Sequence, residues 1–144
     1  MVYHMKGNLL DAADGHIIIP TNTKGVMGAG LARQFKEKFH ELYKVYKDLC
    51  YTYKPKGGDI FTIITPNLEI DSITFVMTKD HYNQPSNYEY IEEALEQLNN
   101  ASIPMDRVIH IPCLGCGLGG LDKVIVKAMI EKRLTNYKTI FLYS

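Results

Sequence analysis

The sequence predicts an α/β protein in which helices cover both faces of a mostly parallel sheet. Residues 17–19 are an apolar run typical of a strand covered on both faces, and residues 108–111 are a short β-branched run typical of a buried strand. Each run is followed by a glycine-rich loop and then by an apolar helical pattern. Two further apolar runs, at residues 59–65 and 73–78, adjoin without a helix between them and indicate an antiparallel hairpin in the same sheet.

Length and composition fit one domain spanning residues 1–144. Lys plus Arg equals Asp plus Glu, at 16 each, and this zero net charge argues against a protein that binds nucleic acid through bulk electrostatics. It leaves room for one small anion in a local pocket. No apolar run approaches the ~20 residues that span a bilayer. No signal peptide precedes Gly7, so we expect a cytoplasmic protein without membrane contact.

The first half of the chain starts with short strands. Residues 1–6 form a candidate strand, and the next strand is expected to end at Pro20. A loop over residues 21–30 leads into a helix that begins near Leu31, where small residues let a ligand approach the backbone. The pattern over residues 43–53 either extends this helix or restarts it.

The second half alternates between strands and helices after the hairpin. A polar loop over residues 79–86 follows the hairpin, and Ser86 or Asn87 is positioned to cap the next helix, with Glu89 near its third position. The remaining elements are a loop over residues 99–106, the strand over residues 108–111, which stops at Pro112, a helix from about Asp122 to Arg133, and a final strand over residues 139–143.

The second glycine-rich loop carries Gly115, Gly117, Gly119 and Gly120. A strand, a glycine loop and a helix start direct backbone N–H groups at an anion, which indicates a phosphate or diphosphate. The alternative is a flexible connection, but one tight turn needs only one or two glycines. The spacing fits neither the Walker A motif nor a dinucleotide fingerprint in its usual place after the first strand.

The cysteines indicate a reduced protein without a metal site. Cys113 and Cys116 form a C-x-x-C pair, but Cys50 is the only other cysteine, so no second pair completes a zinc site. We expect small loop residues in a reducing compartment. We predict no metal and no cofactor.

Three loops follow strands at their carboxyl ends: the two glycine-rich loops and the loop that begins at Lys79. Ligands of such sheets bind at this edge. We therefore expect the three loops to meet at one crevice.

Three segments in this order resemble a macro domain. They are residues 7–10 (Gly-Asn-Leu-Leu), residues 22–36 (Asn-Thr-Lys-Gly-Val-Met-Gly-Ala-Gly-Leu-Ala-Arg-Gln-Phe-Lys) and residues 111–122 (Ile-Pro-Cys-Leu-Gly-Cys-Gly-Leu-Gly-Gly-Leu-Asp). The likeness covers essentially the whole chain. Within the family, the chain resembles the branch that contains terminal ADP-ribose protein glycohydrolase and yeast ADP-ribose-1''-phosphate phosphatase. It implies a three-layer α/β/α sandwich with a mixed, mostly parallel sheet that recognises ADP-ribose.

The resemblance also implies which residues bind the ligand. Asn8 stands where the family has an acidic residue that accepts from the adenine amino group, and its amide oxygen is a neutral substitute. Tyr143 lies where the family stacks a side chain on adenine. The implied ligand-binding residues are Gly7, Asn8, Leu9, Asn22, Val26, Met27, Gly28, Ala29, Gly30, Gly115, Cys116, Gly117, Leu118, Gly119 and Tyr143.

The resemblance implies a catalytic set of Lys79, Asn22 and Asp122. Lys79 matches the lysine that attacks or holds C1'' of the distal ribose. The aspartate that assists it falls at Gly119 and is missing. Asp122 is the nearest carboxylate in that motif, and the alternative for Asp122 is that it caps the following helix.

Two functional readings remain open at this level. The first is a hydrolase of an ADP-ribose derivative, with dephosphorylation of ADP-ribose 1''-phosphate as the first expectation and release of ester-linked ADP-ribose from a modified macromolecule as the next. The second is a module that binds ADP-ribose without turnover. The expected partners are ADP-ribose, a 1''-substituted ADP-ribose, or an ADP-ribosylated protein or nucleic acid. We expect a monomer.

Overall fold

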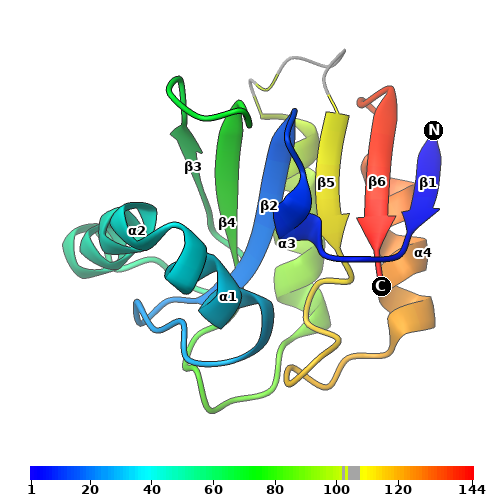
Figure 1. Cartoon of the computed structure of the whole chain (residues 1–144). Coiled ribbons are helices and arrows are strands. Elements are labelled where there is room, and N and C mark those ends of the chain that lie inside the picture. Colours follow the sequence, from blue (N-terminus) through cyan, green and yellow to red (C-terminus); the bar gives the residue numbers. More distant parts are fainter. Residues whose placement is uncertain (102, 104–107) are drawn as a thin grey trace.

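The computed structural model describes residues 1–101, 103 and 108–144. A six-stranded sheet runs through the molecule in the order β1-β6-β5-β2-β4-β3 (Figure 1). All neighbouring strands are parallel except β3 and β4, so the mixed, mostly parallel sheet is confirmed, and its antiparallel pair lies at one edge. The strands are β1 (Val2–Met5), β2 (His16–Asn22), β3 (Ile60–Ile64), β4 (Ser72–Lys79), β5 (Val108–Pro112) and β6 (Thr139–Tyr143).

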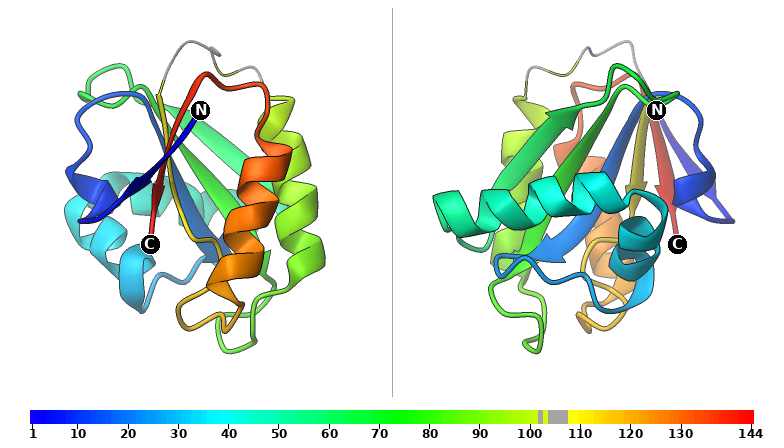
Figure 2. Two further views of the ribbon diagram at one scale, coloured as in Figure 1. Left: turned by 90° about the vertical axis from the view of Figure 1, so that its right-hand side faces the viewer. Right: turned by 60° about the vertical axis from the view of Figure 1, so that its left-hand side comes forward.

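Helices cover both faces of this sheet (Figure 2). The helical elements are η1 (Leu9–Asp11), α1 (Gly30–Lys38), α2 (His40–Tyr53), α3 (Tyr88–Asn99) and α4 (Lys123–Arg133). The pair α1 and α2 lies on one face and the pair α3 and α4 on the other. The three-layer sandwich expected from the sequence is therefore confirmed.

The alternation of side chains along β2 builds two separate cores. Ile18 packs into the cluster beneath α3 and α4, whereas Ile17 and Ile19 pack into the cluster beneath α1 and α2. All three side chains are fully buried, as the unbroken apolar run predicts for a strand covered on both faces. Within the described part of the chain, no helix is long and apolar enough to cross a membrane.

Three boundaries differ from the sequence predictions. β2 does not end at Pro20 but continues to Asn22, because β2 pairs with β5 only at His16 and Ile17. Pro20 lies beyond that ladder, where its missing N–H is tolerated. The strand β5 likewise includes Pro112, and the first long helix breaks at Phe39 and restarts at His40 rather than at residue 43.

The predicted caps of the later helices are correct. Asn87, rather than Ser86, caps α3, and its side chain accepts a hydrogen bond of 2.8 Å from the Glu89 N–H. Asp122 caps α4, which begins and ends within one residue of its predicted bounds. Of the predicted loop over residues 99–106, residues 102 and 104–106 lie outside the described part of the chain.

Candidate functional site

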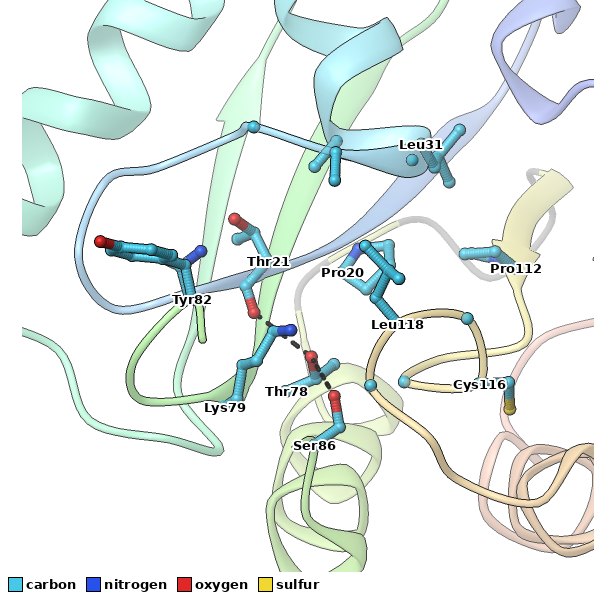
Figure 3. A pocket seen from close by; sticks show the side chains of 18 of the residues that line it. Pro20, Thr21, Leu31, Thr78, Lys79, Tyr82, Ser86, Pro112, Cys116 and Leu118 are labelled. Atoms are coloured by element: carbon cyan, nitrogen blue, oxygen red, sulfur yellow. Dashed lines mark hydrogen bonds between the residues drawn. The ribbon is translucent and has the colours of Figure 1, made fainter. Parts of the chain in front are cut away.

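A cavity of about 500 Å³ lies at the carboxyl ends of β2, β4 and β5, where the three predicted loops meet (Figure 3). The first turn of α1 closes one side of it and the glycine loop after β5 closes the other. The predicted site residues that line it are Asn22, Val26, Gly28, Ala29, Gly30, Lys79, Gly115, Cys116, Gly117, Leu118 and Gly119.

The remaining predicted residues do not line this cavity. Leu9 and Met27 are core residues, exposed by 2% and 1%. Asn8 caps η1 by accepting from the Leu10 N–H at 2.9 Å, and Gly7 precedes it with a φ of 102°. The Asn8 amide oxygen, which was predicted to accept from adenine, therefore accepts from the Leu10 N–H.

Tyr143 belongs to a separate polar cluster. Its hydroxyl lies 2.8 Å from Nδ1 of His110, whose Nε2 lies 2.9 Å from the Asp14 carboxylate. Burial, followed by the charges of Asp14 and Asp11, raises the pKa of Tyr143 above its ordinary value. The cluster ties β5 and β6 to the loop that precedes β2, and Tyr143 is half-buried beside the core under α1.

Asn22 shapes the first glycine loop from inside. Its side chain donates to the Val26 carbonyl at 2.8 Å and accepts from the Lys24 N–H at 2.9 Å, and it is only 4% exposed. The hydroxyl of Tyr46 donates to the Asn22 carbonyl at 2.6 Å. Burial raises the pKa of Tyr46 far above its ordinary value, so the hydroxyl stays a donor. Asn22 thus closes the loop into a ring that borders the cavity.

The amino terminus of α1 borders the cavity, and the N–H groups of a first helical turn have no partner within the helix. Ala29 occupies the cap position, where it offers no side-chain hydrogen bond, and the first turn holds no acidic residue. Ala29, Gly30, Leu31 and Ala32 all line the cavity. The free N–H groups and the helix dipole make this end of the cavity favourable for an anion.

The second glycine loop folds back over itself above Ser86. Gly115 and Gly120 have φ angles of 73° and 79°, which only glycine adopts without strain. The Gly115 carbonyl accepts from the Leu121 N–H at 3.0 Å, and the Gly119 carbonyl accepts from the Ser86 N–H at 2.9 Å. A β-carbon on Gly119 would collide with the Ser86 hydroxyl and with the Gly115 carbonyl. This backbone therefore excludes an aspartate at position 119.

Lys79 is the only charged side chain among the described residues that line the cavity. It ends β4 half-buried, and its amino group has no hydrogen bond or ion pair with the described part of the chain. The next residue is anchored twice. The Asp80 carbonyl accepts from the Thr23 N–H at 3.0 Å, and the Asp80 carboxylate accepts from Gly57 and Tyr90. These bonds fix the backbone of Lys79 while its amino group stays available.

Asp122 is placed as a helix cap. Its carboxylate accepts from the N–H groups of Val124 at 2.8 Å and Ile125 at 3.3 Å, and it does not line the cavity. Of the two roles considered for Asp122, the structure shows the helix cap. The nearest carboxylate of the glycine motif is thus occupied outside the cavity.

Sequence reasoning missed a chain of hydroxyl groups beneath Lys79. The Ser86 hydroxyl donates to Oγ1 of Thr78 at 3.2 Å, and Thr78 donates to the Thr21 carbonyl at 3.3 Å (Figure 3). All three residues line the cavity, as does Tyr82 at its mouth. The positions of Thr21 and Thr78 near strand ends could be predicted from the sequence. The alignment of the Ser86 and Thr78 hydroxyls could not, because it depends on contacts between β4 and the loop before α3.

The C-x-x-C pair lies in the wall of the cavity. The two Sγ atoms are 2.9 Å apart and both cysteines are free thiols. Burial, followed by the hydrogen bond to Cys113, raises the pKa of Cys116 to about 12. Among the described residues, no group of three or more His, Cys, Asp or Glu side chains is arranged to hold a metal ion.

Known proteins resemble this chain over most of its length. A family model described as "Macro domain" matches residues 18–130. A "DNA ADP-ribosyl glycohydrolase" from Thermus aquaticus is 37% identical over 136 residues, which cover 93% of this chain and 38% of that protein. An "ADP-ribose 1''-phosphate phosphatase" from Aspergillus oryzae is 31% identical over 87 residues, which cover 60% of this chain and 35% of that protein. The chain thus spans less than two fifths of the length of these relatives.

Solved structures agree with the sequence matches. The "Macrodomain of Thermus aquaticus DarG" superposes with a TM-score of 0.90 and 34% identity, covering 100% of this chain and 98% of that one. The "Thermosipho africanus DarTG in complex with ADP-ribose" superposes with a TM-score of 0.85 and 26% identity, covering 95% of this chain and 39% of that one.

Proposed function

Because this chain belongs to the macro domain family, we propose that it binds ADP-ribose and hydrolyses the bond between ADP-ribose and a modified nucleic acid. The observation that carries the proposal is the unpaired amino group of Lys79, the only charge among the described residues of a cavity whose other walls offer backbone donors. The relatives named as DNA ADP-ribosyl glycohydrolases support the nucleic acid as the modified partner, since one of them matches 93% of this chain.

The two anion-binding walls of the cavity suit the diphosphate. The first turn of α1 and the glycine loop both line the cavity, and neither brings a carboxylate into it. Helix starts and glycine loops bind anions through their backbone N–H groups. We place the diphosphate between them and the distal ribose beside Lys79. In this arrangement Asn22 positions the Val26 loop against the ribose through its own hydrogen bonds rather than through a free amide.

Lys79 is proposed as the nucleophile. Its neutral amine would form a bond to C1'' of the distal ribose while the bond from C1'' to the nucleic acid breaks, and the departing group would take a proton. Opening of the ribose ring gives an imine, and water then hydrolyses the imine to release ADP-ribose and the free amine. With Gly119 at the position where the resemblance implies an aspartate, the hydroxyl groups of Ser86 and Thr78, which are hydrogen-bonded to one another and line the cavity together with Lys79, are proposed as the proton carriers.

The test compares the wild type with Lys79→Ala on an oligodeoxynucleotide that carries one ADP-ribosyl group. We expect the variant to bind free ADP-ribose but to lose turnover by at least ~100-fold, since covalent and acid–base groups contribute factors of this size. Lys132→Ala, an exposed lysine on α4, is the matched control. Borohydride should trap an adduct on Lys79 during wild-type turnover. Full turnover by Lys79→Ala would remove Lys79 from the mechanism.

A second candidate function is removal of phosphate from ADP-ribose 1''-phosphate. The likeness to the Aspergillus oryzae phosphatase supports it, over 60% of this chain. Phosphate release that survives in Lys79→Ala, with no adduct trapped by borohydride, would favour this function. Calorimetric binding of ADP-ribose without hydrolysis of either substrate would instead identify a module that only binds ADP-ribose.

A further inference from the structure

The strand β4 carries an irregularity where it reaches the cavity. Over most of their length β2 and β4 pair in step, and Thr21 lies opposite Met77. The next residue of β2, Asn22, lies opposite Lys79, so Thr78 is one extra residue in β4. A β-bulge of this kind bends a strand and redirects the side chains that follow it. The direction of Lys79, which extends into the cavity (Figure 3), therefore depends on the backbone just after the bulge.

Asp80 holds this backbone after the ladder between β2 and β4 has ended. The last pair of that ladder is Asn22 and Lys79. Beyond it, the Asp80 carbonyl accepts from the N–H of Thr23 at 3.0 Å and from the hydroxyl of the same residue at 2.7 Å. The main chain of Asp80 is thus tied to the loop that follows β2.

The side chain of Asp80 is tied on both of its oxygens. Oδ1 accepts from the Gly57 N–H at 2.8 Å, and Oδ2 accepts from the Tyr90 hydroxyl at 2.6 Å. The Tyr90 ring lies against Gly57, where no room is left for a β-carbon. The hydrogen bond to Asp80 raises the pKa of Tyr90 above its ordinary value, so the hydroxyl stays protonated and remains a donor. Tyr90, on α3, therefore supplies the side-chain half of a clamp on Asp80.

Lys79 needs such a clamp because its own amino group is not held. Within the described part of the chain, that group has no hydrogen bond or ion pair. Its position is therefore set by the backbone from which the side chain starts. A reacting group that is displaced by about 1 Å can lose ~100-fold in rate, so the backbone at the bulge has to be fixed closely.

We propose that Asp80 and Tyr90 are positioning residues for the reaction at Lys79. The Tyr90 hydroxyl clamps the Asp80 carboxylate, and the clamp holds the bulge that aims the Lys79 amino group at the distal ribose. The inference rests on the proposed function, which puts C1'' beside Lys79. Neither Asp80 nor Tyr90 lines the cavity, so both act through Lys79 and not by contact with the ligand.

The first test measures kcat and KM of Tyr90→Phe on an oligodeoxynucleotide that carries one ADP-ribosyl group. The variant keeps the ring on Gly57 and loses only the hydroxyl. We expect kcat to fall about tenfold or more, while KM and the Kd for ADP-ribose stay within about twofold of the wild type.

Tyr137→Phe is the matched control for lost stability. The buried Tyr137 hydroxyl donates to the Leu98 carbonyl, and Tyr137 precedes β6 at the amino ends of the strands, away from the cavity. This variant also loses one tyrosine hydrogen bond, but it should keep the wild-type kcat. A loss of kcat in Tyr137→Phe as large as that in Tyr90→Phe would overturn the positioning role.

Variants of Asp80 test whether Tyr90 acts through it. Asp80→Asn keeps an acceptor for the Gly57 N–H and gains an amide that can donate to the Tyr90 oxygen, so it should stay within about threefold of the wild-type kcat. Asp80→Ala loses both bonds and should fall at least as far as Tyr90→Phe. Adding Tyr90→Phe to Asp80→Ala should cause no further loss. A further loss in the double variant would show that Tyr90 acts by another route.

A second readout needs binding but no turnover. Reductive methylation with ¹³C-formaldehyde labels the lysine amines, and the NMR signal of Lys79 is identified by its absence in Lys79→Ala. Saturation with ADP-ribose should shift this signal in the wild type, and should shift it much less in Tyr90→Phe at the same Kd. The signal of Lys132, an exposed lysine on α4, should not move in either protein.

The outcomes separate the two proposals. Wild-type kcat in Tyr90→Phe, or a Lys79 signal that responds to ADP-ribose equally in Tyr90→Phe and the wild type, would overturn the clamp. Failure of the wild type to hydrolyse any substrate, with a Lys79 signal that still depends on Tyr90, would overturn the proposed hydrolysis and leave the clamp standing.

Discussion

Ser86 occupies the space that a side chain at Gly119 would need. The Ser86 N–H donates to the Gly119 carbonyl at 2.9 Å, and the Ser86 hydroxyl lies where a β-carbon on Gly119 would project. Ser86 itself is 7% exposed and donates onward to Thr78. Gly119, which stands where the resemblance implies an aspartate, is therefore part of a packed contact between the glycine loop and the loop after β4.

We predict that Gly119→Ala lowers both stability and ligand binding. The added methyl group collides with the Ser86 hydroxyl and with the Gly115 backbone, and overpacking of this kind costs ~1–3 kcal/mol. Thermal unfolding should report a loss of several degrees. Gly117→Ala is the matched control, since a β-carbon there meets nothing within 4 Å and its φ is not in the left-handed region. Equal stability of the two variants would contradict the contact.

Adding Ser86→Ala to Gly119→Ala separates the collision with the Ser86 hydroxyl from the collision with the Gly115 carbonyl. It removes the hydroxyl but leaves the Gly115 carbonyl in place, so it should recover part of the lost stability and not all of it. A double-mutant cycle measures the share that belongs to Ser86.

Ala29→Asp should raise stability and weaken ligand binding at the same time. Ala29 has the extended backbone of a helix cap but no side-chain acceptor, so an aspartate there should gain ~0.5–2 kcal/mol. That corresponds to roughly 3 °C per kcal/mol for a chain of this size. The same carboxylate would occupy the N–H groups proposed to bind the diphosphate and would repel it.

The comparison of Ala29→Asp with Ala29→Ser isolates charge from capping. Serine caps the helix without a charge, so it should raise the melting temperature while costing less affinity for ADP-ribose in calorimetry. An Ala29→Asp protein that binds ADP-ribose as tightly as the wild type would contradict the placement of the diphosphate at α1.

Asn22→Asp is predicted to lose stability and activity together. The Asn22 amide donates to the Val26 carbonyl from a site that is 4% exposed, and a carboxylate would put two acceptors against one another there. A buried acceptor left without a donor costs ~1–3 kcal/mol, and more when it is charged. Urea denaturation should show a lower midpoint. Lys79→Ala, by contrast, should lower turnover with little change in that midpoint, because its amino group has no hydrogen bond or ion pair to lose within the described part of the chain.

Local sequence patterns predicted the elements but not the contacts between loops. The Ile17–Ile19 run, the Asn87 cap and the Asp122 cap depend on neighbours within four residues, so their positions could be predicted from the chain alone. The packing of Ser86 on Gly119 joins segments that are 33 positions apart and left no local signal. Pro20 misled the prediction because tolerance of proline in a strand depends on which neighbour the strand has.

The predicted binding residues also divide into those that were placed correctly at the cavity and those that were not. The loops after β2, β4 and β5 converge because parallel strands end at one edge of a sheet, a general consequence of topology. The predicted contacts of Asn8 and Tyr143 with adenine came from the resemblance, and the structure gives both side chains partners of their own: the Leu10 N–H for Asn8 and His110 for Tyr143. The bond of Tyr143 is set by tertiary packing, whereas that of Asn8 is a local cap of η1.

Oxidation of Cys113 and Cys116 should close a disulfide in the cavity wall and weaken ADP-ribose binding. Their Sγ atoms lie 2.9 Å apart, and a peroxide would supply the oxidant, with two thiols losing two electrons and two protons as the peroxide is reduced to water. Burial raises the pKa of Cys116 to about 12. Because the thiolate is the reactive form, its population stays small at neutral pH and grows as the pH rises towards that value.

The reaction should therefore be slow at pH 7 and faster at pH 9, and intact mass should report the loss of two hydrogens. Cys50 is buried and its pKa is also raised, so it should remain reduced and serve as an internal control. Cys113→Ser should abolish the mass change and keep ADP-ribose binding during peroxide treatment. Binding that falls equally in Cys113→Ser would show that peroxide acts elsewhere in the protein.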